Sequence, residues 1–195
     1  TGVGGSLRFR YLAGLAPRQR GRRTGAVARV LVVGVHNPAM THGVVKAVQQ
    51  AFPDGGRGDH LSFFFRPHPT APPGSLDRVE GWPAVEGDLA PQLEEFDLVV
   101  TTGSTVALEA RFRGVPVIIF RSATDLDADD LGNMAPKGFL KYASAGEMRE
   151  QIMRQLREPG GESADEAGLR DSLFSAVDEQ AWVKAVGVPC GVASR

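Results

Sequence analysis

The segment at residues 97–120, DLVVTTGSTVALEARFRGVPVIIF, constrains the fold more than any other part of the chain. Two apolar, β-branched runs enclose a stretch with helical spacing, and Gly114 stands where that helix would end. Two strands joined through a helix form a parallel pair, because a parallel connection needs a crossover of this kind. The segment therefore predicts one β–α–β unit of an α/β sheet.

The same alternation of strands and helices extends along the rest of the chain. Further strands are predicted at 28–35, 60–65 and 137–143, a short edge strand at 78–87, and further helices at 41–52, 89–96 and 147–158. Asp88 and the pattern Ser144-Ala-Gly-Glu147 are expected to cap two of these helices. Because the strands are apolar on both faces, the pattern predicts a doubly wound, Rossmann-like α/β fold. Its sheet is mainly parallel, with five or six strands and helices on both faces.

Length and composition set the expected domain organisation. The 195 residues suit one compact domain with a small appendage. Residues 1–25, rich in Gly and Arg, are interpreted as a linker or interdomain remnant, or as a surface for phosphate or membrane head groups. Residues 26–160 are the predicted Rossmann-like domain, and residues 161–195 its C-terminal helices.

The net charge and the cysteine content limit the partners and the cellular location expected for the protein. A net charge of −1 gives no case for nucleic acid as a partner. The single cysteine, Cys190, excludes an intrachain disulfide and favours a reducing compartment. No stretch approaches the roughly 18 apolar residues of a membrane span. A cytoplasmic location is expected, and a peripheral association with the inner face of the membrane stays open.

The TTGST turn lies at the end of the sheet where ligands of such folds bind, outside the carboxyl ends of the strands. Gly103 permits a tight turn before the helix, whose first N–H groups carry partial positive charge. The hydroxyls of Ser104 and Thr105 add donors for a phosphate held there. The alternative is that Thr102 or Ser104 only caps the helix. The turn is neither a P-loop nor a dinucleotide-binding GxGxxG motif.

RPHPT follows a second strand at the same end of the sheet. Pro67 and Pro69 restrict the backbone around His68, so its imidazole is held in a narrow range of directions. His68 is therefore a candidate ligand-binding residue, with Arg66 as an anion partner. A purely structural histidine is the alternative.

Glu109 follows Thr105 by one helical turn and has apolar neighbours on both sides. A carboxylate in that setting can accept two hydrogen bonds from the hydroxyls of a ribose. A solvated position on the face of the helix is the alternative.

The remaining polar loops are weaker candidates. Gly34 and His36 follow the first strand and are candidate loop contacts for a ligand. The histidines show no metal-ligand spacing, so no metal site is predicted. Asp127-Ala-Asp129, within the Asp125–Asp130 loop, matches the DxD of metal-dependent nucleotide-sugar enzymes, but a solvated acidic loop is the preferred interpretation.

His68-Pro69, Ser104-Thr105 and Glu109-Ala110 together resemble the carboxyl-terminal half of GT-B glycosyltransferases. The likeness extends over residues 27–157. It is greatest to bacterial surface-carbohydrate enzymes of the sialyltransferase-like and polysialyltransferase-like groups, in which an HP motif and a Ser/Thr motif hold the phosphate and the base or ribose of a nucleotide sugar. The chain also resembles glycerol-phosphate polymerases of teichoic-acid synthesis and, more loosely, the UDP-GlcNAc 2-epimerases.

The resemblance implies a glycosyltransferase donor domain in bacterial surface polysaccharide or O-antigen biosynthesis. Its substrate would be a CMP-, UDP- or GDP-linked sugar, held without a metal or other cofactor. His68 would be the catalytic residue and, with Arg66 and the helix start at Ser104 and Thr105, would stabilise charge on the departing phosphate. Glu109 would hold the ribose. The acceptor-binding N-terminal domain of the same enzyme is the implied partner, so the chain alone is expected to bind nucleotide but transfer little sugar. An epimerase-like nucleotide-sugar enzyme and a non-catalytic α/β interaction domain are the alternatives.

Overall fold

The computed structural model describes residues 27–122 and 139–157. The chain divides into two compact units, and all described residues belong to the unit Pro17–Glu162. Residues 1–26, 123–138 and 158–195 lie outside the description, and with them the predicted linker, the Asp125–Asp130 loop and the C-terminal helices. The domain boundaries expected at residues 25 and 160 therefore stay predictions.

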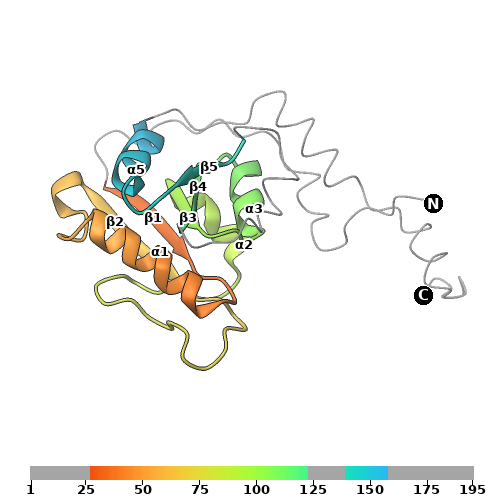
Figure 1. The fold of residues 1–195 in the computed structure, drawn as a ribbon. Coiled ribbons are helices and arrows are strands. Elements are labelled where there is room, and N and C mark those ends of the chain that lie inside the picture. The colour runs from red at the N-terminus through yellow and green to blue at the C-terminus, as the bar shows by residue number, and fades with distance from the viewer. Residues whose placement is uncertain (1–26, 123–138, 158–195) are drawn as a thin grey trace, which may run out of the picture. The chain divides into compact units, whose positions relative to one another are not determined.

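Five parallel strands form one sheet in the order β2-β1-β3-β4-β5 (Figure 1). They are β1 Ala28–Val33, β2 Leu61–Arg66, β3 Leu98–Thr101, β4 Val117–Phe120 and β5 Lys141–Ala143. Each apolar run predicted as a main strand is present. The prediction of a parallel α/β sheet is confirmed.

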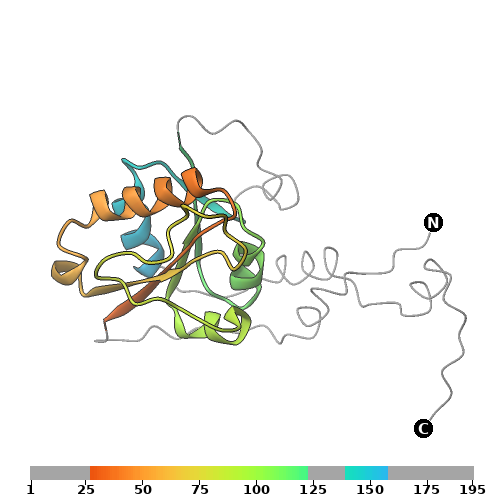
Figure 2. The same cartoon turned by 90° about the horizontal axis from the view of Figure 1, so that it is seen from below.

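Helices cover both faces of this sheet (Figures 1 and 2). The described helices are α1 Pro38–Ala51, η1 Arg57–Asp59, α2 Leu89–Gln92, η2 Leu93–Glu95, α3 Val106–Phe112 and α5 Met148–Arg157. α1 and α5 contact one another on one face, and α3 lies against β3 and β4 on the other. The doubly wound arrangement is therefore confirmed. Within the described part of the chain, no helix has the length and apolarity that a bilayer span requires.

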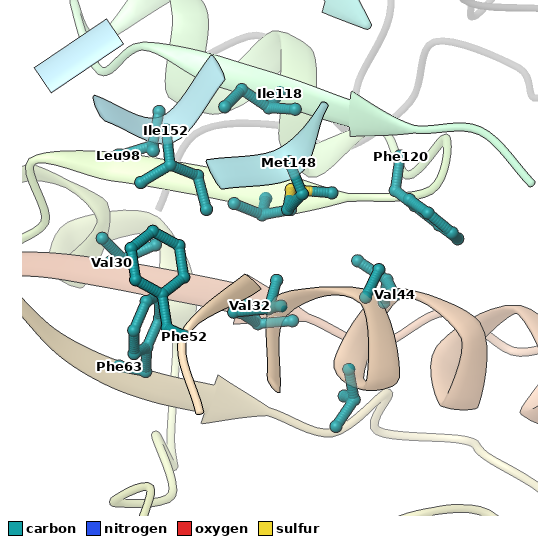
Figure 3. Close-up of a cluster of buried hydrophobic side chains, with 14 of the residues drawn as sticks. Val30, Val32, Val44, Phe52, Phe63, Leu98, Ile118, Phe120, Met148 and Ile152 are labelled. Carbon is teal, nitrogen blue, oxygen red and sulfur yellow. The ribbon is translucent and has the colours of Figure 1, made fainter. Parts of the chain in front are cut away.

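The core shows why the strands are apolar throughout. Alternate side chains of a strand point to opposite faces of a sheet. Residues of β1, β3 and β4 pack against α1 and α5 on one face, as Figure 3 shows for Val30, Val32, Leu98, Ile118, Val44, Met148 and Ile152. The intervening residues Leu31, Val99 and Val117 are buried as well. A strand that is buried on both faces of the sheet needs apolar residues at consecutive positions, which explains the uninterrupted apolar runs.

The segment predicted as a short edge strand at 78–87 forms no strand. Ala84 makes a single bridge to Phe65 of β2, the edge strand. The Phe65 N–H donates to the carbonyl of Pro83 at 3.0 Å, and the Val85 N–H donates to the carbonyl of Phe65 at 2.8 Å. Pro83 has no N–H and cannot continue a ladder, which is the reason the pairing stops after one bridge.

The predicted helix ends are present. The Asp88 carboxylate accepts a hydrogen bond from the Ala90 N–H at 3.2 Å at the start of α2. Gly114 has a φ of 74°, the left-handed conformation that ends α3. Before α5, the Glu147 carboxylate accepts from the Ser144 N–H at 3.0 Å and from its hydroxyl at 2.7 Å.

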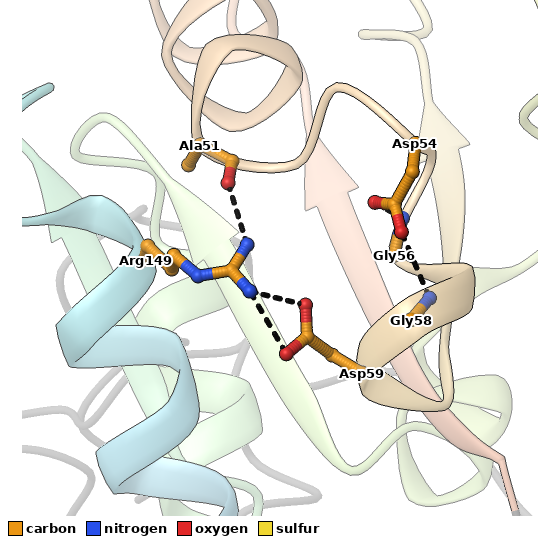
Figure 4. A network of polar contacts seen from close by, with 6 residues as sticks. All are labelled: Ala51, Asp54, Gly56, Gly58, Asp59 and Arg149. Atoms are coloured by element: carbon orange, nitrogen blue, oxygen red, sulfur yellow. Dashed lines mark hydrogen bonds and ion pairs between the residues drawn. The ribbon is translucent and has the colours of Figure 1, made fainter.

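A polar network joins α5 to the end of α1 (Figure 4). The Arg149 guanidinium donates to both carboxylate oxygens of Asp59, at 2.9 and 2.7 Å, and to the carbonyl of Ala51 at 3.0 Å. The same guanidinium lies 4.9 Å from the ring centroid of Phe52. One arginine therefore ties together two helices and the turn before β2.

Asp54 stabilises that turn in a way that depends on pH. Its carboxylate accepts from the Gly58 N–H at 2.8 Å and the Gly56 N–H at 3.0 Å, and these two bonds lower its pKa below the ordinary 3.8. A lowered pKa contributes stability above the unfolded-state value, and this stability is lost as pH falls through the folded-state value. We expect Asp54→Ala to unfold at lower urea than the wild type at about pH 7, and the difference to shrink below about pH 3. A deficit that did not change with pH would contradict this role of the charge.

Candidate functional site

The strand order locates the candidate site independently of any motif. From β1 the chain goes to β2 on one side of the sheet and then crosses to β3 on the other side. Such a reversal is a topological switch point, and ligands of open α/β sheets bind there, outside the carboxyl ends of the strands. The two loops that leave the sheet at the switch point are Gly34–Asn37 after β1 and Thr102–Thr105 after β3.

The loop after β1 is held tightly to its neighbours. The Gly34 N–H donates to the carbonyl of Arg66 at 2.8 Å. A Cβ on Gly34 would lie 3.1 Å from the Cγ2 of Thr41 and 3.4 Å from that carbonyl, so a larger residue has little room. The Thr41 hydroxyl accepts from the Val35 N–H at 2.9 Å and donates to the Val35 carbonyl at 3.0 Å. These bonds fix the backbone that carries His36.

The start of α1 adds positive potential at the same place. Asn37 caps the helix, with its side-chain oxygen accepting from the Ala39 N–H at 2.9 Å, and Pro38 takes the first helical position. The first turn of this 14-residue helix contains no acidic residue. The partial positive charge of the helix end is therefore not neutralised by its own side chains.

Two imidazoles meet beside this loop. The rings of His36 and His68 are 5.6 Å apart between centroids and inclined at 76°, an edge-to-face contact. The Nδ1 of His68 accepts from the Thr70 N–H at 3.3 Å. Because a backbone N–H can only donate, the proton of the neutral His68 ring lies on Nε2. The structure thus brings together the two histidines that the sequence placed on separate loops.

The TTGST turn has the geometry expected of a tight turn, with Gly103 at a φ of 123°. The Ser104 hydroxyl accepts from the Val106 N–H at 3.3 Å, so it takes the capping role that the sequence left open. Thr102 is buried, with 8% of its surface exposed, and its hydroxyl has no hydrogen-bond partner within the described residues. Thr105 makes no side-chain capping bond. Capping therefore accounts for one hydroxyl of this turn.

Glu109 is buried in α3. Only 8% of its surface is exposed, so the interpretation as a solvated helix residue is wrong. Ala107, Leu108 and Ala110 beside it are buried too. Within the part of the chain that the structure describes, its carboxylate has no hydrogen bond or ion pair. Neither carboxylate oxygen of Glu109 is among the fully buried, unpartnered polar atoms of the described residues, so the carboxylate reaches the surface of the protein.

Arg66 is engaged elsewhere than expected. Its guanidinium donates to the carbonyl of Val85 at 2.7 Å and to that of Gly87 at 2.6 Å. Two of its five N–H groups therefore hold the segment that follows β2. Its role as an anion partner stays a prediction.

The arrangement of the sheet and its helices is shared with known proteins. The rhamnosyltransferase SpnG has a TM-score of 0.52 at 16% identity over 85% of this chain and 46% of its own, and the calicheamicin glycosyltransferase CalG4 has 0.52 at 16% over 89% and 45%. The UDP-GlcNAc 2-epimerase of Methanocaldococcus jannaschii has 0.50 at 14% over 74% and 44%. No protein-family model matches the sequence, and no curated protein matches it significantly.

The likeness is one of fold. The chain has the Rossmann-like α/β fold found in GT-B glycosyltransferases, and it spans less than half of the length of these proteins. This part of the sequence-based prediction is confirmed. The likeness assigns no substrate and no residue role to this chain.

The strand order adds the relative positions of the motifs, which the sequence left open. The sequence places the RPHP loop and the TTGST turn at the same end of the sheet, and the structure shows that β1 lies between their strands, β2 and β3. The loop that adjoins the TTGST turn on that side is the one that carries His36. Among residues 27–122 and 139–157, no three His, Cys, Asp or Glu side chains gather in a way that could hold a metal ion.

Sequence reasoning missed one charged residue at this edge. Arg121 follows β4 directly, and its guanidinium lies 4.0 Å from the ring centroid of Tyr142 in β5. The signal available in the sequence was its position immediately after the VIIF run. The acidic residues that follow it led instead to the interpretation of the whole segment as a solvated acidic loop.

Proposed function

We propose that the chain is the donor-binding domain of a GT-B glycosyltransferase and that it binds a nucleotide sugar at the switch point. The observation that carries the proposal is the buried hydroxyl of Thr102 in the TTGST turn, which has no hydrogen-bond partner within the described residues. A buried polar group without a partner in the protein is explained when a ligand completes its hydrogen bonds. The fold supports the same conclusion, since SpnG has been solved with thymidine diphosphate at a TM-score of 0.50 to this chain.

Each side chain has a role in this proposal. The start of α1 and the TTGST turn direct N–H and hydroxyl donors toward the phosphates. His68 donates from Nε2 and stabilises the charge that develops on the departing phosphate, with His36 beside it. Glu109 accepts hydrogen bonds from the ribose hydroxyls, and Thr102 supplies a further hydroxyl. These groups are positive or neutral donors apart from Glu109, so the proposal requires no metal ion.

The setting of the enzyme is part of the same proposal. We place the transfer in bacterial surface polysaccharide or O-antigen biosynthesis, on the cytoplasmic side, on the basis of the HP, Ser/Thr and Glu-Ala motifs. An acceptor-binding domain would supply the remainder of the enzyme, because the chain spans 46% of SpnG. The chain alone is then expected to bind nucleotide without efficient transfer. Robust sugar transfer by the chain alone would contradict this division.

Nucleotide titration tests the binding site directly. We expect at least one of UDP, TDP, GDP and CMP to bind the chain, as measured by calorimetry. In NMR spectra the nucleotide should shift the amide signals of Gly34, His36, Gly103, Ser104 and Glu109. Amides of the network around Arg149, joined to the far end of α1, should not shift and are the internal control. If no nucleotide binds, the non-catalytic interaction domain is favoured instead.

An epimerase-like activity is the second candidate, favoured by the fold shared with the UDP-GlcNAc 2-epimerase. It would use the same phosphate contacts but would change the sugar without an acceptor. Incubation of the chain with UDP-GlcNAc, followed by NMR of the sugar protons, separates the two. Conversion to a second epimer would support this candidate over the donor domain.

A further inference from the structure

Arg121 is held in a defined position at the carboxyl end of β4. Its N–H donates to the carbonyl of Ala143 at 2.9 Å, and its guanidinium lies 4.0 Å from the ring centroid of Tyr142. The residue is exposed. A guanidinium packed on an aromatic ring is held by cation–π attraction, and its N–H donors lie in its own plane. Such a group is suited to bidentate recognition of a phosphate.

The register of the sheet places Arg121 beside the TTGST turn. Thr101 of β3 lies opposite Ile119 of β4. Two residues further along each strand, Gly103 and Arg121 leave the sheet at the same level. Adjacent strands are about 5 Å apart, whereas β2, which carries His68, is two strands and about 10 Å from β3. Arg121 therefore leaves the sheet nearer to the turn than His68 does.

Arg121 also lies on the face of the sheet that α3 covers. Ile118 and Phe120 belong to the core beneath α1 and α5. Alternation along the strand directs Ile119 and Arg121 to the opposite face, and Tyr142 lies opposite Ile119 in the register. α3 packs on that face and begins beside the TTGST turn. Arg121 thus shares both its edge and its face with the start of α3.

We propose that Arg121 binds the phosphate groups of the nucleotide, with Tyr142 as the positioning residue for its guanidinium. This inference rests on the proposed function and adds a permanently charged group to the phosphate site. The imidazoles of His36 and His68 then contact the nucleotide from the β1 and β2 side of the TTGST turn and Arg121 contacts it from the β4 side.

The test compares a nucleotide with its own nucleoside. The nucleotide that binds the chain most tightly among UDP, TDP, GDP and CMP is titrated into the wild type and Arg121→Gln. We expect the substitution to weaken nucleotide binding about 10- to 30-fold, because a charge-assisted contact is lost. Binding of the nucleoside, which lacks phosphate, should not change. Arg121→Lys keeps the charge but not the planar, forked donor group of arginine. Its nucleotide affinity should therefore lie between those of the wild type and Arg121→Gln.

Matched variants separate this role from a structural one. Arg111→Gln removes another arginine that packs on an aromatic ring, 5.6 Å from the centroid of Phe139, but it lies in the last turn of α3. It should leave nucleotide affinity unchanged. Tyr142→Leu should weaken nucleotide binding about threefold while sparing the nucleoside, and Tyr142→Phe should restore it.

The outcomes distinguish this inference from the proposed function. If the wild type binds nucleotide and Arg121→Gln binds it equally well, the role of Arg121 is wrong and the donor site stands. If nucleoside binding falls as much as nucleotide binding, Arg121 contacts the base and the phosphate assignment is overturned. If the wild type binds no nucleotide, the proposed function fails and this inference fails with it.

Discussion

Replacing Glu109 by alanine is expected to lower ribonucleotide affinity about 100-fold without lowering the free energy of unfolding. Each hydrogen bond to a charged acceptor contributes about 1.5–3 kcal/mol, and the carboxylate can accept from both ribose hydroxyls. Stability should not fall, because the Glu109 carboxylate makes no hydrogen bond or ion pair within the described residues that the substitution would remove. The measurements are calorimetric titration and urea unfolding of the same variant.

The sugar of the nucleotide provides the decisive control for this prediction. Among UDP, GDP and CMP, the ribonucleotide that binds most tightly should bind the wild type more tightly than its 2′-deoxy form does, and Glu109→Ala should lose that preference. Glu109→Gln keeps one acceptor oxygen and should show an intermediate loss. Glu150→Ala removes an exposed helical carboxylate of α5 and should change neither affinity nor preference. An undiminished preference for the ribonucleotide over its 2′-deoxy form in Glu109→Ala would place the ribose elsewhere.

The fold was predictable because local patterns and long-range packing agree in this chain. β1, β3 and β4 are buried on both faces, so burial requires the uninterrupted apolar runs that the sequence shows. Asp88 begins a helix through a short-range hydrogen bond, and Gly114 ends a helix through its left-handed backbone conformation. Signals of this kind depend only on neighbouring residues, and a single sequence contains them.

The order of the strands was not predictable in the same way. The alternation of strands and helices is the same whether β2 lies beside β1 or beside β3. The sequence therefore placed the RPHP loop and the TTGST turn at the same end of the sheet without showing that β1 and its loop, which carries His36, lie between them. The contact between His36 and His68 follows from this order, since each follows one of two adjacent strands.

Side-chain partners from distant segments were the other source of error. The charge of Arg66 indicated an anion site, but the carbonyls of Val85 and Gly87 lie within its reach only because that segment returns along β2. Arg121 meets Tyr142 through the register between β4 and β5. For Glu109, apolar neighbours left both burial and exposure open, and the packing of α3 on the sheet decided for burial.

The substitution with the largest expected effect on stability is Phe65→Ala in β2. Because Phe64 precedes Phe65 in the same strand, the same substitution at Phe64 is its control. Phe65 is completely buried, within the core beneath α1. Phe65→Ala should lower the free energy of unfolding by about 3–5 kcal/mol, the cost of the lost apolar burial and of the cavity. Phe64 points to the other face, is half-buried and packs on Arg29 and Phe96, with its ring centroid 5.4 Å from that of Phe96. Phe64→Ala should cost about 1–2 kcal/mol.

The comparison also tests how the core supports the candidate site. Phe65 holds the segment after β2 through its backbone bonds to Pro83 and Val85, and His68 follows it by three residues. If the unfolding free energy of a variant falls with urea concentration at the same slope as that of the wild type, the variant retains the same native core. Phe65→Leu, which keeps most of the volume, should cost about 1 kcal/mol and keeps the site measurable if the alanine variant unfolds. The register of β2 determines which of its side chains face the buried side of the sheet and which face the half-buried side. Equal losses of unfolding free energy in Phe65→Ala and Phe64→Ala would contradict this assignment.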